Sequence, residues 1–173
     1  MLAYVLVLAV IVARIVFRPL AFAPVGPALL FFGAYMPRRW MWVPLALLAA
    51  TDVYLTRSSY GYPFTADILV TWAWYALVLW AGGALLKGRV RPLPVAGVTV
   101  AAAVAFFAIS NFAVWAVWNM YPKTLGGLAA CYVAALPFFR NQFVSDLLFA
   151  AVMFAVPLAL PALRPAEAKE RAA

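Results

Sequence analysis

The sequence predicts an all-α integral membrane protein, built as a bundle of six transmembrane helices with a short embedded or interfacial segment before the last one. Of its 173 residues, 69% are hydrophobic and only 10% are charged, and the mean hydropathy is +1.01. Soluble domains hold roughly 45–50% apolar and about 25% charged residues. At about 20 residues per span, the chain has room for one compact bundle. We predict a single transmembrane domain over residues 1–163 and a short polar cytoplasmic tail over residues 164–173.

Apolar stretches separated by charged residues, proline and glycine mark the expected helices. The first five cover about 2–17, 26–36, 41–55, 65–86 and 94–118. The first stretch resembles the apolar part of a signal peptide, with AFA as a cleavage motif. No basic residue precedes it, however, and Pro24 would directly follow the cut, so we expect a retained helix.

The last apolar region, 124–162, is too long for a single span and contains the polar run ALPFFRNQFVSD, Ala135 to Asp146. Pro137 lacks the N–H that a continuous helix needs. We therefore predict a short embedded or interfacial segment at about 124–137 and a final helix at about 141–162. Arg140 and Asn141 would then lie at a helix N-terminus, which favours anionic partners. Asp146 would either pair with Arg140 as a structural clamp or contribute to a ligand site.

The distribution of basic residues predicts the topology. With both termini cytoplasmic, the cytoplasmic side holds Arg38, Arg39, Lys87, Arg89, Arg91, Arg164, Lys169 and Arg171. The opposite side holds Arg14, Arg18, Arg57 and Lys123. This asymmetry follows the positive-inside rule and predicts a multi-pass protein of the inner (cytoplasmic) membrane with both termini cytoplasmic. The net charge of +8 then reflects topology and attraction to anionic lipid headgroups, and we expect no nucleic-acid partner.

The polar residue content argues against catalysis and against a metal site. The chain has no histidine, one cysteine and five acidic residues, so histidine-based metal sites and catalytic triads are excluded. An enzyme would need Asp52 or Asp146 beside Arg140, and we expect none. Cys131 is interpreted as a small core residue. The alternative is a thiolate ligand for a soft metal, such as the cobalt of a corrinoid, with Lys123 or Arg140 lowering its pKa.

Asp52, near the end of the third predicted helix, should face inward or sit near the interface, because a lipid-facing carboxylate costs about 3 kcal/mol. It either pairs with Arg57, Arg18 or Arg140 or points into a ligand cavity. The tyrosines and tryptophans near it are interpreted as an interfacial belt, and the alternative is that they form the walls of a pocket. In the helix expected at about 2–17, Ala9 and Ala13 share one face, which permits close packing either within the bundle or against a partner subunit.

Two stretches carry a resemblance to known families. The run PVGPALLFFGAYMPRRWMWVPLALLAATDVYL, with a following aromatic loop and the basic turn KGRVRP, resembles the first half of the substrate-binding S components of energy-coupling-factor (ECF) transporters. The run SNFAVWAVWNMYPKTLGGLAACYVAALPFFRNQFVSDLLF resembles a family of bacterial membrane proteins catalogued as a domain of unknown function. The S-component resemblance implies a vitamin-sized ligand beneath the 56–64 loop. It also implies docking of Ala9 and Ala13 on a transmembrane coupling protein that works with ATPase subunits.

We therefore expect a membrane protein that binds a small vitamin-like organic solute from the extracytoplasmic side for uptake. The expected ligand-binding residues are Asp52, Tyr60, Asn111, Trp115, Asn119, Tyr121, Arg140 and Asn141. The alternative is an accessory or structural subunit of a larger membrane complex, with no substrate of its own. We expect no cofactor beyond the less favoured corrinoid or soft-metal contact at Cys131, and any ATP-driven step requires separate subunits because the chain has no Walker loop.

Overall fold

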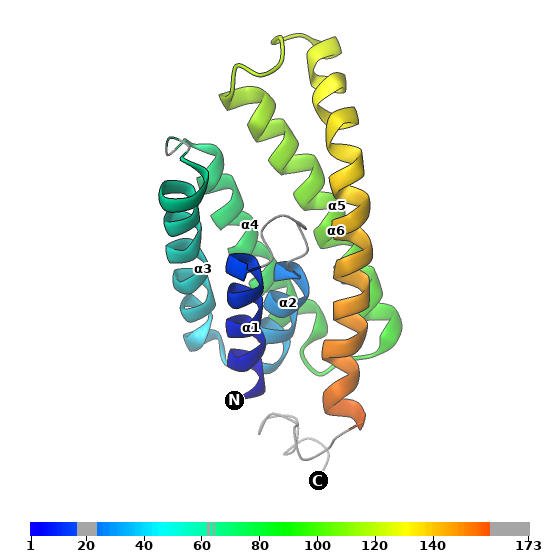
Figure 1. Cartoon of the computed structure of the whole chain (residues 1–173). Coiled ribbons are helices and arrows are strands. Elements are labelled where there is room, and N and C mark those ends of the chain that lie inside the picture. Colours follow the sequence, from blue (N-terminus) through cyan, green and yellow to red (C-terminus); the bar gives the residue numbers. More distant parts are fainter. Residues whose placement is uncertain (17–23, 62, 64, 160–173) are drawn as a thin grey trace.

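The computed structural model is all-α, as predicted (Figure 1). It describes residues 1–16, 24–61, 63 and 65–159, and the side chains of these residues except 59, 60 and 158. The described residues form six α-helices: α1 Leu2–Val16, α2 Val25–Tyr35, α3 Trp42–Leu55, α4 Asp67–Ala81, α5 Pro92–Val117 and α6 Leu125–Ala159. Three short elements join them: the 3-10 turn η2 Arg38–Trp40 and the π-helical turns η3 Thr56–Tyr60 and η4 Gly82–Leu86. The predicted tail over residues 164–173 lies outside the described residues.

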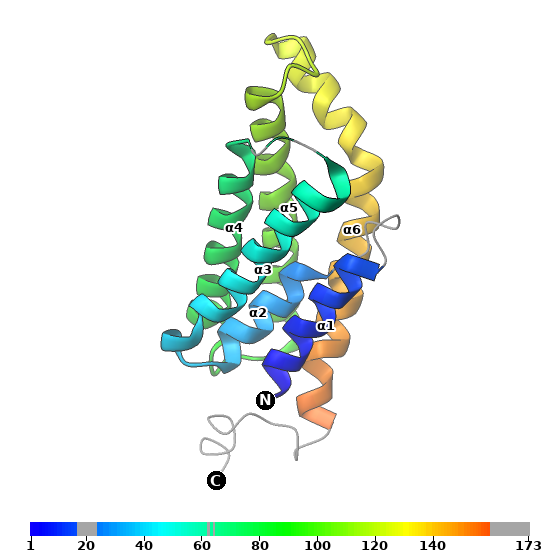
Figure 2. The same ribbon diagram turned by 60° about the vertical axis from the view of Figure 1, so that its left-hand side comes forward.

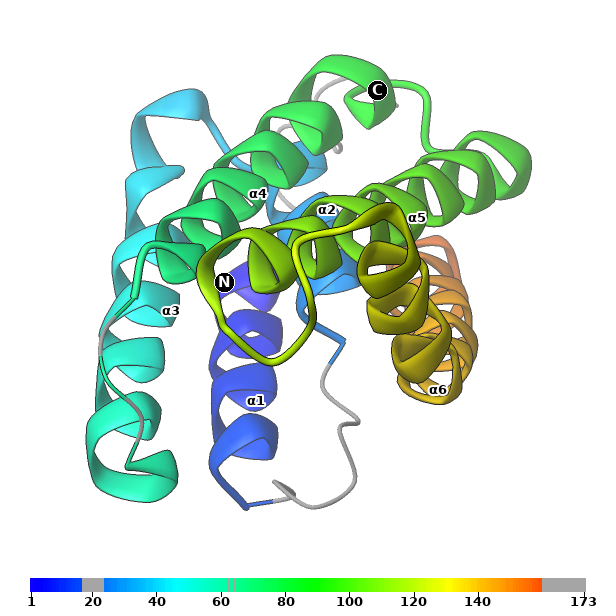
Figure 3. The ribbon, with the colours of Figure 1, turned by 90° about the horizontal axis from the view of Figure 1, so that it is seen from above.

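The short helix α2 is the centre of the bundle. Its sequence, VGPALLFFGAY, is apolar on every face, and all residues from Gly26 to Tyr35 are buried. A helix that is apolar all round lies either in a protein core or in lipid, and α2 lies in the core of this bundle. Viewed from above, α2 lies inside the ring of α1, α4, α5 and α6, while α3 lies at the edge (Figure 3).

Backbone contact joins α2 to the continuous helix formed by α4 and η4. A Cβ atom added to Gly33 would lie 2.1 Å from the Leu79 carbonyl oxygen, and one added to Gly82 would lie 2.4 Å from the Leu30 carbonyl oxygen. Neither position has room for a side chain. Small residues permit this approach, which maximises van der Waals contact between helices in an apolar environment.

The helices alternate in direction, so the basic turns gather at one end of the bundle. The turn after α2 and the turn after η4 lie at the same end as the start of α1 and the end of α6 (Figures 1 and 2). These turns carry Arg38, Arg39, Lys87, Arg89 and Arg91. Arg57 and Lys123 belong to turns at the opposite end. The fold therefore separates the described charges as the topology predicts.

The predicted break before the last helix is wrong, because α6 runs from Leu125 to Ala159 with Pro137 inside it. Helix α6 packs on α5 on both sides of the proline. Before it, the Tyr132 hydroxyl donates to the Ala108 carbonyl; after it, Phe139 packs on Phe107 with ring centroids 4.5 Å apart. These contacts hold the two halves in line despite the missing N–H. Long membrane helices tolerate proline when neighbouring elements support them.

Three of the helices are long and apolar enough to cross a membrane. They are Asp67–Leu86, Pro92–Val117 and Leu125–Pro157. Helices α1 and α2 are also apolar but shorter. These features indicate a multi-pass membrane protein. That all six helices cross the membrane stays a prediction.

The backbone contact of α2 can be tested by adding a methyl group. We expect Gly33→Ala to lower the free energy of unfolding by about 1–3 kcal/mol or more, because the new Cβ meets backbone atoms that cannot move aside. Unfolding of the purified protein in mixed micelles, followed by tryptophan fluorescence, measures the change. The matched control is Gly97→Ala in α5, where a Cβ meets nothing within 4 Å. It should be neutral or stabilising by up to about 1 kcal/mol. Equal effects at the two positions would contradict the packing.

Candidate functional site

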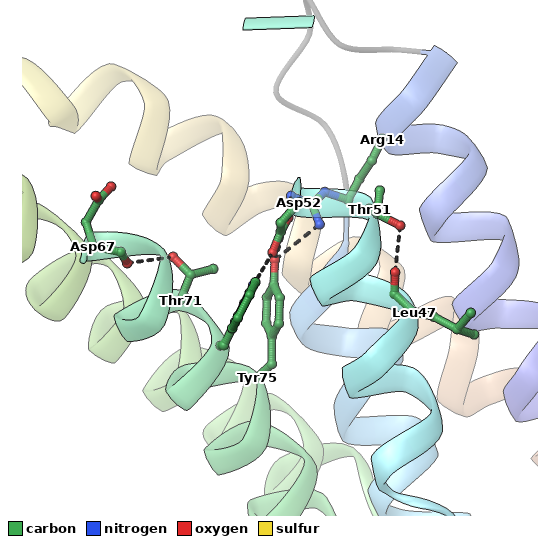
Figure 4. Close-up of polar contacts among 8 residues, drawn as sticks. Arg14, Leu47, Thr51, Asp52, Asp67, Thr71 and Tyr75 are labelled. Carbon is green, nitrogen blue, oxygen red and sulfur yellow. Dashed lines mark hydrogen bonds and ion pairs between the residues drawn. The ribbon is translucent and has the colours of Figure 1, made fainter. Parts of the chain in front are cut away.

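A buried polar cluster joins α1, α3 and α4 around Asp52 (Figure 4). The Arg14 guanidinium lies 2.7 Å from Asp52 Oδ1 and forms an ion pair with it. The Tyr75 hydroxyl donates to the same oxygen at 3.4 Å, and the Trp72 indole N–H donates to Oδ2 at 3.1 Å. Arg14 Nη1 also donates to the Tyr75 hydroxyl oxygen at 3.1 Å. Both carboxylate oxygens of Asp52 are therefore satisfied by protein groups.

Each side chain reaches the cluster for a local reason. Arg14 lies in the last turn of α1, where the helix dipole favours a cation. Trp72 and Tyr75 are three residues apart in α4 and therefore share one face of that helix. The hydroxyl of Thr51, next to Asp52, bonds the Leu47 carbonyl in its own helix at 2.7 Å, so it does not compete for the carboxylate.

The electrostatics of the cluster leave some capacity for a ligand. The Asp52 side chain is 7% exposed and that of Arg14 is 20% exposed. A buried carboxylate is tolerable here because an ion pair and two further hydrogen bonds offset its loss of hydration. A guanidinium has five N–H donors, more than its contacts with Asp52 and Tyr75 use. Arg14 can therefore bind an additional anionic or carbonyl group at its exposed edge.

The partner of Asp52 differs from the sequence expectation. Arg57 and Arg140 are exposed on η3 and α6, and the third expected partner, Arg18, lies outside the described residues. Arg14 takes this role instead, because α1 packs beside α3. Sequence reasoning counted Arg14 only as a topological charge and missed Trp72 and Tyr75. One signal was available: an arginine within an apolar helix is costly unless it is paired.

Several other predicted ligand residues belong to the tip of the α5–α6 hairpin, away from this cluster. Trp115 Nε1 donates to the Pro122 carbonyl at 2.9 Å. The Lys123 ammonium donates to the Trp118 carbonyl at 2.7 Å and lies 5.6 Å from the Trp115 ring. Lys123 thus satisfies carbonyl groups at the end of α5. Asn119 is exposed and Tyr121 half-buried in the same turn. The polar groups of Trp115 and Lys123 thus bond to carbonyl groups within the tip itself.

Asn111 and Cys131 connect the two helices of the hairpin below the tip. The Asn111 side-chain amide donates to the Phe107 carbonyl of its own helix at 2.7 Å. The buried Cys131 thiol donates to the Asn111 carbonyl, with Sγ 3.5 Å from the oxygen. Cys131 therefore packs in the α5–α6 interface, and no group of three or more His, Cys, Asp or Glu side chains surrounds it or any other point of the described chain.

Arg140 and Asn141 are exposed in the middle of α6, so the predicted placement at a helix N-terminus is wrong. Asp146 is buried and its Oδ1 has no hydrogen-bond partner. Asp146 lies six residues after Arg140 in α6, so the two side chains face different sides of the helix. The expected ion pair between them does not form. The Tyr60 side chain lies outside the described residues.

The two small residues singled out in α1 do not lie on its buried face. Ala9 is exposed and Ala13 half-buried, whereas the buried face of this helix consists of Ala3, Val7 and Val10. Ala9 therefore does not serve packing within the bundle, which was one of the two interpretations of this pair of alanines.

Comparison with known proteins gives one match. The model of a family of unknown function, DUF6580, matches residues 1–167. The chain belongs to the DUF6580 family. No curated protein and no solved structure matches it. The resemblance of the second half to a domain of unknown function is thus confirmed, and the DUF6580 match extends over nearly the whole chain.

The Asp52 cluster of this DUF6580 protein can be tested with a double-mutant cycle. We expect Asp52→Ala to lower the free energy of unfolding by about 3–5 kcal/mol, because it leaves the largely buried Arg14 charge without its partner. Combining it with Arg14→Met should recover part of this loss, giving a coupling energy of about 0.5–3 kcal/mol. Unfolding in mixed micelles measures all three variants. As a control, Arg57→Met removes an exposed charge and should change stability by less than about 0.5 kcal/mol. Strict additivity of the two core substitutions would contradict the ion pair.

Proposed function

We propose that this DUF6580 protein binds a small, vitamin-like organic solute from the extracytoplasmic side for uptake, in the manner of an ECF transporter S component. The observation that carries the proposal is the convergence of Arg14, Asp52, Trp72 and Tyr75 from three helices. Polar groups that meet inside an otherwise apolar bundle are typical of ligand sites, and ionisable groups in membrane helices are a functional-site hypothesis by default.

The cluster's position supports binding from outside the cell. Arg14 comes from the last turn of α1, and Asp52 comes from near the end of α3. Both helices end opposite the basic turns at Arg38, Arg39 and 87–91 (Figure 1). By the positive-inside rule, the basic end is cytoplasmic. The cluster would then lie toward the extracytoplasmic side.

The chemistry of the cluster favours a solute with a carboxylate or another anionic group. The partly exposed Arg14 guanidinium supplies planar donors that suit such a group. The sequence-based expectation placed the site between the 56–64 loop, the end of the fifth helix and the start of the last helix. This proposal moves it to the interface of α1, α3 and α4. Among the predicted ligand residues, Asp52 remains at its centre, where it orients Arg14.

Energy coupling would require partners. The outward face of α1 combines the exposed Ala9 with the exposed Val5 and Val12, a combination of small and branched residues that permits close helix packing in a membrane. We propose this face as the contact with a transmembrane coupling protein, which would in turn bind the ATPase subunits.

The α5–α6 hairpin favours a second candidate function, that of an accessory subunit in a larger membrane complex. Its tip projects beyond the other helices (Figures 1 and 2). On the helices below the tip, Phe112 of α5 and Val133, Leu136 and Phe138 of α6 are exposed. Gentle-detergent purification distinguishes the two functions. A stoichiometric partner that is neither an ATPase nor a coupling protein would favour the accessory role.

The solute-binding function predicts a co-purifying small molecule, detectable by mass spectrometry of the purified protein. We expect Arg14→Lys to keep the charge opposite Asp52 but to weaken solute binding by at least about tenfold, because an ammonium lacks the planar fork of donors. The matched control, Arg57→Lys, should retain the molecule. Absence of any co-purifying molecule, together with unchanged thermal stability across a panel of vitamins, would contradict the proposal.

A further inference from the structure

A second set of polar groups lies inside the bundle, away from the Asp52 cluster. Asp146 and Ser145 of α6 are 3% and 1% exposed, and Thr99 of α5 is 2% exposed. Asp146 Oδ1, Ser145 Oγ and Thr99 Oγ1 are all buried without a hydrogen-bond partner. Each such atom costs about 1–3 kcal/mol when nothing pairs with it. The presence of three unpaired polar atoms inside one apolar bundle therefore needs a physical explanation.

The antiparallel packing of α5 and α6 brings these residues to one level. The Cys131 thiol meets the Asn111 carbonyl, and the Tyr132 hydroxyl meets the Ala108 carbonyl. Following α5 toward its start and α6 toward its end from these contacts, Thr99 comes level with the turn that carries Ser145 and Asp146.

Contacts with α2 and α4 support the same placement. A Cβ added to Gly26, in the first turn of α2, would lie 3.7 Å from Asp146 Oδ2 and 3.5 Å from the Trp74 ring. The Trp74 indole N–H donates to the Ala102 carbonyl at 3.2 Å, one turn beyond Thr99. Trp74 therefore bridges the surroundings of Asp146 and the Thr99 turn of α5.

The chemistry of the three atoms points to a cation. A carboxylate and two hydroxyl groups supply oxygen lone pairs, which are the ligands of small hard cations. Asp146 has no protein cation beside it in the described chain: Arg14 pairs with Asp52, and Arg140 is on the exposed side of α6. The Gln142 side chain, one turn earlier, forms a hydrogen bond with the Asp146 carboxyl but carries no charge to balance it. A buried carboxylate without a counter-charge is strongly disfavoured in a membrane helix.

We propose that Asp146, Ser145 and Thr99 form a binding site for Na⁺ inside the bundle. The single positive charge balances the carboxylate, and the two hydroxyl oxygens complete part of the coordination shell. This site is separate from the proposed solute site, because it belongs to α5 and α6 beside the start of α2, whereas the Arg14–Asp52 cluster joins α1, α3 and α4.

The test compares the thermal stability of the purified protein in NaCl, KCl and choline chloride at constant ionic strength and mildly alkaline pH. We expect a saturable rise in Tm with Na⁺ that K⁺ and choline do not reproduce, and binding of radioactive sodium with the same concentration dependence. Equal stabilisation by all three salts would overturn the site.

Two variants and a control test whether these residues cause the Na⁺-dependent rise in Tm. Asp146→Asn should abolish the Na⁺-dependent rise in Tm. Thr99→Val should raise Tm in choline, because it removes an unpaired buried hydroxyl, while weakening Na⁺ binding by about tenfold or more. The control Ser110→Ala removes an α5 hydroxyl that bonds the Phe106 carbonyl of its own helix and should keep the full response to Na⁺. A response that persists unchanged in Thr99→Val, or that is lost equally in Ser110→Ala, would refute the assignment even if Asp146→Asn does not fold.

Discussion

The backbone contact between α2 and the α4–η4 helix determines how the other helices are placed. Gly33 and Gly82 leave no room for a Cβ atom between the two helices, so their axes are fixed close together. On its remaining sides the short α2 is covered by α1, α5 and α6. Because α2 contains no polar side chain that could bond to its neighbours apart from Tyr35, its position depends on shape. Asp146 lies beside the first turn of this apolar helix, and α1 and α4, which pack on it, carry three of the residues of the Asp52 cluster.

Helix positions were predictable from the sequence where local chemistry decides them. The third helix was expected at about 41–55 and lies at Trp42–Leu55; the fifth was expected at about 94–118 and lies at Pro92–Val117. Apolar runs bounded by charge and proline carry this information. The effect of Pro137 was not predictable in the same way. Whether a proline ends a helix depends on what packs on both sides of it, and here Phe107 of α5 supports Phe139 beyond the proline.

For the candidate site, too, the sequence predicted what local chemistry decides but not what depends on helix packing. The cost of a lipid-facing carboxylate predicted that Asp52 lies near the interface or faces inward, and it is buried. Its partners come from α1 and α4, and the sequence does not show which faces of these helices meet α3. Arg140 and Asn141 were grouped with Asp52 because a break at Pro137 would have brought them to the same end of the bundle. Because α6 is continuous, Arg140 and Asn141 lie in the middle of the helix and this reason for grouping them with Asp52 does not apply.

The two buried carboxylates differ in how the protein satisfies them, and α4 lies between them. Asp52 has an arginine, a tyrosine and a tryptophan as partners, so it is neutralised within the fold. Asp146 Oδ1 has no hydrogen-bond partner among the described residues. Tyr75 and Trp74 are consecutive residues of α4 with ring centroids 5.8 Å apart; Tyr75 faces Asp52, and Trp74 lies beside Gly26 next to Asp146. A rotation of α4 would therefore disturb both carboxylate environments at once. Since the contact with α2 restrains this rotation, the packing of two glycines helps to hold both polar groups in place.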